Sequence, residues 1–179
     1  MDSENKKHGL FLGALLLLVV VLSGYILTQE QIRNSDETTI LRTMPIDPRD
    51  LLRGEYVTLR YEIARDELVQ EVVSQSGGEK SVCIGLSEDQ VGVASVSDVY
   101  PGVCSSNDEG LWISGEINGQ GVRFPEIEQY FVPEGTGLGV EHLRSDVSVE
   151  ISLLNGRARV LRLLDANFEP IDPEDYLEQ

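Results

Sequence analysis

The residues that could support hydrolysis are few in this chain. A serine-histidine-aspartate triad would have to use His142, because the other histidine, His8, stands at the start of an apolar leader. No serine has the glycine pattern of a nucleophile elbow around it. A serine-lysine pair would need Lys80, but the stretch SGGEKS predicts a turn and not a buried strand. The sequence therefore gives little support to nucleophilic catalysis, and we assign no catalytic residue.

Carboxylates are so abundant that no single pair is informative. Glu126, Glu128 and Glu134 could flank a sugar as general acid and base, although a solvated acidic rim explains them more simply. The oxygen-rich stretch 105–110 could ligate calcium but lacks the spacing of an EF-hand loop. The glycine-rich stretch 132–139 lacks the Lys-Ser/Thr ending of a phosphate loop. We therefore expect no metal and no cofactor.

An uncharged segment of eighteen residues, Leu10 to Leu27, is long enough to span a bilayer. It exceeds the apolar core of a typical signal peptide, about 7 to 15 residues, which favours an uncleaved anchor over a cleaved signal sequence. Lys6 and Lys7 precede it, so the positive-inside bias places the chain after Thr28 outside the cytoplasm. The predicted location is the cytoplasmic membrane, crossed once, with the N-terminus inside and the domain facing the periplasm or exterior.

The net charge of −17 belongs to the part that follows the leader. The first 27 residues carry two acids and two lysines, which leaves 29 acidic and 12 basic residues for the remainder. Nucleic acid and anionic lipid both require a basic face, so neither is expected as a partner.

Two cysteines, Cys83 and Cys104, lie in the part of the chain that is expected to face an oxidising compartment. A disulfide between them is permitted there, and two unpaired buried thiols are the alternative. A zinc site would need further ligands, and His142 is the one histidine outside the leader.

Beyond the leader, short β-type segments alternate with turn signals. From Glu55 to Ile63, apolar side chains alternate with polar ones, which predicts one strand with a wet face. Asn118-Gly119 and Asn155-Gly156 mark two hairpins. The stretch 68–75 fits either a short helix or a strand, and 140–143 fits a short helix.

These patterns predict a mainly β fold, a single small sandwich or barrel-like domain of short antiparallel strands behind an N-terminal transmembrane helix. The expected boundaries are 1–28 for the anchor or signal sequence, 29–37 for a polar tether, 38–168 for the β-rich domain and 169–179 for an acidic tail. The tether could also continue the anchor as a short helix. The tail is interrupted by proline and is expected to lie on the surface or to fray.

The stretch DPRDLLRGEYVTLRYEI, residues 47–63, concentrates turn formers, arginines and acids before the predicted strand. Gly54 suits a positive φ or a bulge at the strand entrance. Arg49 and Arg53 flank Asp47, Asp50 and Glu55 at spacings that allow a guanidinium-carboxylate network. Such a network would fasten the loop to the strand, or the same residues would contact a partner.

The segment RGEYVTLRY resembles the signature of the GDYXXLXY family of bacterial proteins. Gly54, Tyr56, Leu59 and Tyr61 match it, and Glu55 stands where the family pattern has aspartate. The preceding DPRDLLR and the later YFVPEG, which contains Glu134, also resemble the family, so the resemblance covers most of residues 40–165. A turn that an aspartate caps in the family would change here, because glutamate is one methylene longer.

The resemblance implies a single-anchor or exported protein that accompanies multi-spanning membrane proteins, in a family without an established biochemical function. We therefore expect a non-enzymatic, membrane-anchored accessory protein that binds a partner integral membrane protein. The alternative is an exported hydrolase that acts on cell-envelope material. The expected interaction residues are those of the matching segments: Asp47, Arg49, Arg53, Gly54, Glu55, Tyr56, Leu59, Tyr61 and Glu134.

Overall fold

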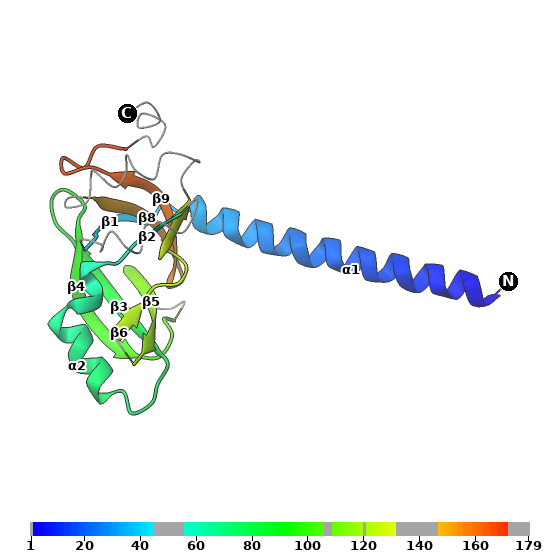
Figure 1. Ribbon diagram of the computed structural model, residues 1–179, viewed down its shortest axis with the longest axis horizontal. Helices are drawn as coiled ribbons and strands as arrows, with labels where there is room; N and C mark the ends of the chain where they lie inside the picture. Colours follow the sequence, from blue (N-terminus) through cyan, green and yellow to red (C-terminus); the bar gives the residue numbers. More distant parts are fainter. Residues whose placement is uncertain (1, 45–55, 106–108, 120, 132–146, 172–179) are drawn as a thin grey trace.

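Figure 1 shows the computed structural model of the protein, which describes residues 2–44, 56–105, 109–119, 121–131 and 147–171. In these residues a long N-terminal helix is followed by short strands, one 3-10 helix and one further α-helix. In chain order the elements are α1 (Asp2–Arg33), β1 (Thr38–Arg42), β2 (Tyr56–Thr58), η2 (Glu62–Arg65), α2 (Glu67–Gln75), β3 (Ser81–Glu88), β4 (Ala94–Pro101), β5 (Leu111–Asn118), β6 (Gly121–Arg123), β7 (Gln129–Phe131), β8 (Ser148–Leu154) and β9 (Arg157–Leu164).

Helix α1 extends away from the domain along most of its length (Figure 1). Its segment 8–33 is long and apolar enough to cross a membrane, and none of its most apolar window is buried in the protein. Its C-terminal end is attached to the domain, because α1 contacts β8 and β9 and Ile32 is only 2% exposed. The first residues of the expected tether, 29–33, belong to the same helix as the apolar segment.

The domain consists of two antiparallel sheets and a two-stranded ribbon. One sheet has the order β1-β8-β9, the other has the order β4-β3-β5-β6, and β2 pairs with β7. The two sheets are joined where the Ile40 amide donates to the Gly92 carbonyl (2.9 Å) and the Ser114 amide to the Gly156 carbonyl (2.7 Å). The described strands do not close into a barrel, so the mainly β prediction is confirmed in its sandwich-like form.

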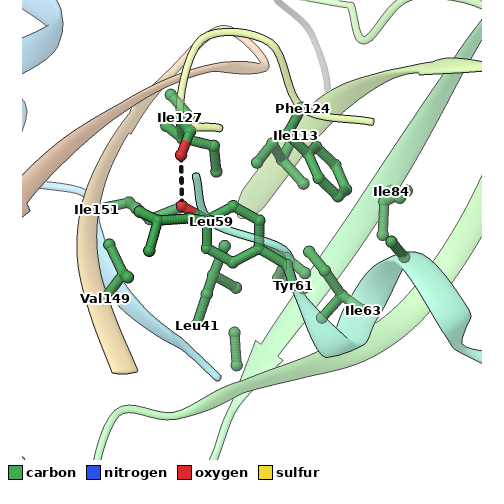
Figure 2. Close-up of a cluster of buried hydrophobic side chains, with 14 of the residues drawn as sticks. Leu41, Leu59, Tyr61, Ile63, Ile84, Ile113, Phe124, Ile127, Val149 and Ile151 are labelled. Carbon is green, nitrogen blue, oxygen red and sulfur yellow. Dashed lines mark hydrogen bonds between the residues drawn. The ribbon is translucent and has the colours of Figure 1, made fainter. Parts of the chain in front are cut away.

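The core lies between the two sheets (Figure 2). Leu41 and Ile151 come from the β1-β8-β9 sheet, and Ile84 and Ile113 come from the other sheet. Each fully buried side chain of this size contributes about 1.5–3 kcal/mol to folding. Tyr61 enters the same core from the connection between β2 and α2, so a residue of the matched motif is part of the packing.

Both predicted hairpins are confirmed. β8 pairs with β9 across Asn155-Gly156, as predicted. β5 pairs with β6, but Asn118 is itself a strand residue opposite Gly121, so this turn begins at Gly119, one residue later than predicted. Asn155 (φ 52°) and Gly156 (φ 76°) both have positive φ, which a two-residue turn between twisted strands requires.

The single strand predicted for residues 55–63 is wrong in its extent. β2 ends at Thr58, and the chain turns through η2 (Glu62–Arg65) towards α2. The alternation still predicted burial correctly, because Leu59, Tyr61 and Ile63 are buried. The chain must leave the short ribbon to reach α2, and the Ala64 amide closes that turn on the Tyr61 carbonyl (3.2 Å).

The ambiguous stretch 68–75 forms helix α2. Its N-terminus is capped by Asp66, whose side chain accepts from the Leu68 amide (3.0 Å), and Val69 is fully buried beneath it. The short helix expected at 140–143 lies outside the described residues. The surface position expected for the tail is wrong at Ile171, which is buried and whose amide donates to the Leu163 carbonyl (2.9 Å).

Candidate functional site

The structure describes three of the nine expected interaction residues. Leu59 and Tyr61 are described in full, and Tyr56 is described as the first residue of β2. The other six lie outside the described residues, namely Asp47, Arg49, Arg53, Gly54, Glu55 and Glu134.

The ribbon of β2 and β7 brings two of the matching segments together. Tyr56 is opposite Phe131, and Thr58 is opposite Gln129, in an antiparallel pair. RGEYVTLRY and YFVPEG, which are about 70 residues apart in the chain, therefore share backbone hydrogen bonds. The Leu59 amide continues this contact by donating to the Glu128 carbonyl (2.7 Å).

Tyr61 is held by packing and by one hydrogen bond (Figure 2). Its ring is 2% exposed and meets Phe124 edge to face at 5.9 Å between centroids. Its hydroxyl donates to the Ile127 carbonyl (2.6 Å). Burial, with a smaller contribution from the negative charge of Glu128, raises the pKa of Tyr61 well above its usual range. Tyr61 therefore stays a neutral donor at physiological pH.

A groove of about 640 Å³ opens beside Leu59 and Tyr61. We call it the motif groove. It is bounded by the η2 and α2 segment on one side and by β6 and the residues after it on the other, and its volume falls within the range of small-molecule sites. Its polar side chains include Arg60, Arg65, Arg123 and Glu128.

The charge of the motif groove contrasts with that of the chain. Three of its described lining residues are arginines and one is a carboxylate, in a protein of net charge −17. Arg123 is committed to Glu128, with Nη2 to Oε2 at 2.5 Å and Nε to both oxygens at 3.1 Å. This pairing is the main reason that the pKa of Arg123 is raised. Arg65 has an exposed side chain at the same groove.

The chemistry that this set of side chains supports is recognition of an anionic group. An arginine presents planar donors that match a carboxylate. The described lining contains no serine, cysteine, histidine or lysine, and its hydroxyl, that of Tyr61, is already bound to Ile127. The sequence interpretation did not include Arg60, Arg65 or Arg123. The scarcity of basic residues was the signal that could have drawn attention to them.

The carboxylates considered for sugar chemistry have structural partners. Glu126 accepts from Arg157 Nε (2.8 Å) and from the Ala158 amide (3.0 Å), and Glu128 is bound by Arg123. Glu134 lies outside the described residues. Among the residues that the structure describes, no group of three or more His, Cys, Asp or Glu side chains could hold a metal ion.

Cys83 and Cys104 form a disulfide that ties β3 to the segment before β5. Gly156 of the β8-β9 turn lies against it, since a Cβ at this position would meet the Cys104 Cβ at 2.5 Å. The disulfide therefore lies at the junction of the two sheets, where the Gly156 carbonyl accepts from Ser114.

The comparisons with known proteins agree with the sequence motif. The model of the GDYXXLXY protein family matches residues 18–163, which include the end of α1, the motif strand β2 and both sheets through β9 as far as Leu163. Searches of curated proteins and of solved structures gave no match. The match covers most of the chain, and the chain therefore belongs to the GDYXXLXY family.

Proposed function

We propose that this protein is a membrane-anchored, extracytoplasmic accessory protein that binds a partner integral membrane protein through its motif groove. α1 confines the domain to the membrane, and the partner supplies a segment with an acidic side chain to the groove. The observation that carries the proposal is the gathering of arginines beside the paired motif segments of a strongly acidic chain.

Binding explains the motif better than catalysis does. Leu59 and Tyr61 are buried and form part of the wall of the motif groove. The pairing of β2 with β7 holds the segment YFVPEG against the segment RGEYVTLRY. Arg65 presents its exposed donors to the same groove, beside the Arg123–Glu128 pair. The alternative, an exported hydrolase acting on envelope material, needs a nucleophile or a general acid, and the described lining offers Tyr61 and Glu128, which are both engaged.

The first test is photocrosslinking in native membranes from a photoreactive side chain at position 65. The second test combines a charge reversal at Arg65 with a photoreactive side chain elsewhere in the groove. Arg65→Glu is expected to abolish crosslinking of one integral membrane protein from a second reporter at position 70, which also lines the groove. Lys80→Glu is the matched control, because it changes the net charge by the same amount at an exposed residue that does not line the groove.

The proposal fails if no integral membrane protein crosslinks from positions 65 and 70. It also fails if Arg65→Glu, shown by circular dichroism to be folded, crosslinks as the wild type does. In that case the motif is a structural feature of the domain, and envelope-derived substrates become the next compounds to test.

A further inference from the structure

A second groove, which we call the anchor groove, lies between the C-terminal turns of α1 and the domain. Its volume is about 770 Å³. Tyr25, Ile26 and Glu30 line it from the helix, and Phe131, Arg159 and Val160 line it from β7 and β9. The groove combines apolar, aromatic and charged side chains, and this combination suits an amphiphilic ligand.

The two walls of the anchor groove are fastened to each other. Ile32, one turn beyond the groove, is buried against the domain, and α1 contacts β8 and β9. Arg159 Nη1 also donates to the Oε1 of Gln29 across the groove (3.4 Å). Because the two walls are fastened together, the position of α1 in a membrane also determines how close to the membrane the wall formed by β7 and β9 lies.

That depth follows from the length of the apolar segment. Leu10 to Leu27 has eighteen residues, which at 1.5 Å per residue span about 27 Å, close to the roughly 30 Å of a hydrocarbon core. In a bilayer centred on this segment, Tyr25 and Ile26 lie just inside the hydrocarbon boundary, and Glu30 lies just outside it. Phe131, which is 72% exposed, faces the same groove and reaches the headgroup level, where aromatic side chains are enriched.

The charges of the anchor groove have a definite pattern at that level. Arg157 pairs with Glu126 (2.8 Å), whereas Arg159 is half-buried and donates to the neutral amide of Gln29. In the described part of the chain no carboxylate pairs with Arg159. Glu30 contributes an exposed carboxylate to the same groove. One arginine without a carboxylate partner and one exposed carboxylate, in a groove that is also lined by Tyr25, Ile26 and Phe131, match a zwitterionic headgroup attached to an acyl chain.

We propose that the anchor groove binds a phospholipid with a zwitterionic, ammonium-bearing headgroup, with its phosphate at Arg159, its ammonium at Glu30 and its chain along Tyr25 and Ile26. The half-buried guanidinium is well suited to a phosphate diester. A net charge of −17 repels lipids whose headgroup is anionic, so the charge of the whole chain favours the zwitterionic class. This inference does not depend on the partner protein proposed above.

Lipid binding to the full-length chain in detergent micelles tests the proposal by native mass spectrometry, with phosphatidylethanolamine and phosphatidylglycerol as probes. The wild type is expected to retain phosphatidylethanolamine about tenfold better than phosphatidylglycerol. Arg159→Gln is expected to lose roughly tenfold in affinity for phosphatidylethanolamine, the usual effect of losing one charge-assisted contact. Arg162→Gln, which removes the same charge from the same strand at its pair with Glu150, should bind as the wild type does.

Glu30→Gln tests the contact with the ammonium group separately from the contact with the phosphate. It should reduce the preference for phosphatidylethanolamine over phosphatidylglycerol without abolishing binding, because the phosphate contact remains. The proposal is overturned if Arg159→Gln binds as tightly as the wild type, or if phosphatidylglycerol is preferred. A protein mass that lacks the leader overturns it as well, since the groove then has no helical wall.

Tryptophan quenching measures the predicted depth independently. In a Trp112→Phe background, which removes the native fluorophore, Phe131→Trp is expected to be quenched by brominated phosphatidylethanolamine in vesicles. Leu68→Trp is the control, because Leu68 is exposed on α2, and α2 lies on the side of the domain away from α1 (Figure 1). Equal quenching at the two positions, or none at position 131, contradicts the proposal.

Discussion

The hydroxyl of Tyr61 connects the family motif to the stability of the domain. It donates to the Ile127 carbonyl inside the core, and the ring packs against Phe124. A motif residue in such a place stabilises the fold whether or not the surface nearby binds a partner, because a buried carbonyl without a donor is costly. Tyr61 therefore has a structural role, and the exposed arginines next to it are better candidates for contact.

Replacing Tyr61 by Phe is expected to lower the free energy of unfolding by about 1–2 kcal/mol, since the ring remains and the Ile127 carbonyl loses its donor. Tyr61→Ala should cost roughly 3–5 kcal/mol, because it also leaves a cavity. Urea unfolding of the full chain, followed by circular dichroism, measures both. Equal losses for the two variants would show that the hydrogen bond, and not the ring, holds the segment.

The same residue predicts a loss of stability in alkali. Its folded-state pKa is raised, so its contribution is complete below the unfolded pKa, about 10, and is lost as the pH rises above that value. Unfolding midpoints measured between neutral pH and pH 11 should fall for the wild type and fall less for Tyr61→Phe. A parallel decline in both proteins would assign the alkaline loss to other groups.

Asp89 predicts the opposite behaviour in acid. Hydrogen bonds from the Val93 and Val91 amides lower the pKa of this carboxyl, so its contribution is present above the unfolded value, about 3.9, and is lost as the pH falls below it. Asp89→Asn, which keeps an acceptor oxygen but does not titrate, should show a shallower loss of thermal stability between pH 5 and pH 2. An unchanged slope would contradict the assignment.

At the scale of elements, local chemistry decided what the sequence could predict. Asn155-Gly156 specifies its hairpin because both residues adopt positive φ within the turn itself. The strand from residue 55 to 63 was predicted too long, because its end at Thr58 depends on the distant partner β7 and on the turn that leads to α2. The motif groove was not predictable at all, since Arg65 and Arg123 come to line one groove only in the folded domain.

The β8-β9 turn gives a prediction with an internal control. Gly156→Ala should destabilise the domain more than Gly92→Ala does. Both glycines have positive φ, but an added Cβ meets Cys104 at 2.5 Å at position 156 and meets nothing within 4 Å at position 92. The difference between the two unfolding free energies measures the contact between the sheet junction and the disulfide. If the two variants lose the same amount, backbone strain alone accounts for both effects.

At the scale of the whole molecule, the leader and the disulfide depend on each other. A bond between Cys83 and Cys104 closes a loop with a sequence separation of 21, which stabilises a domain by about 3 kcal/mol in the chain-entropy account. Thiols remain reduced in the cytoplasm, so the domain gains this stabilisation only where it faces an oxidising compartment. The state of the two cysteines therefore reports on which side of the membrane the domain lies.

Reversing the charges that precede the apolar segment should change that state. Lys6→Glu with Lys7→Glu removes the positive-inside signal, so a fraction of the chains should keep the domain in the cytoplasm with free thiols. Alkylation of denatured, unreduced protein with a maleimide polymer measures that fraction as a gel shift, which the wild type should not show. Lys80→Glu, which changes a lysine within the domain, should stay oxidised. Full oxidation of the Lys6 and Lys7 variant would mean that other features orient the helix.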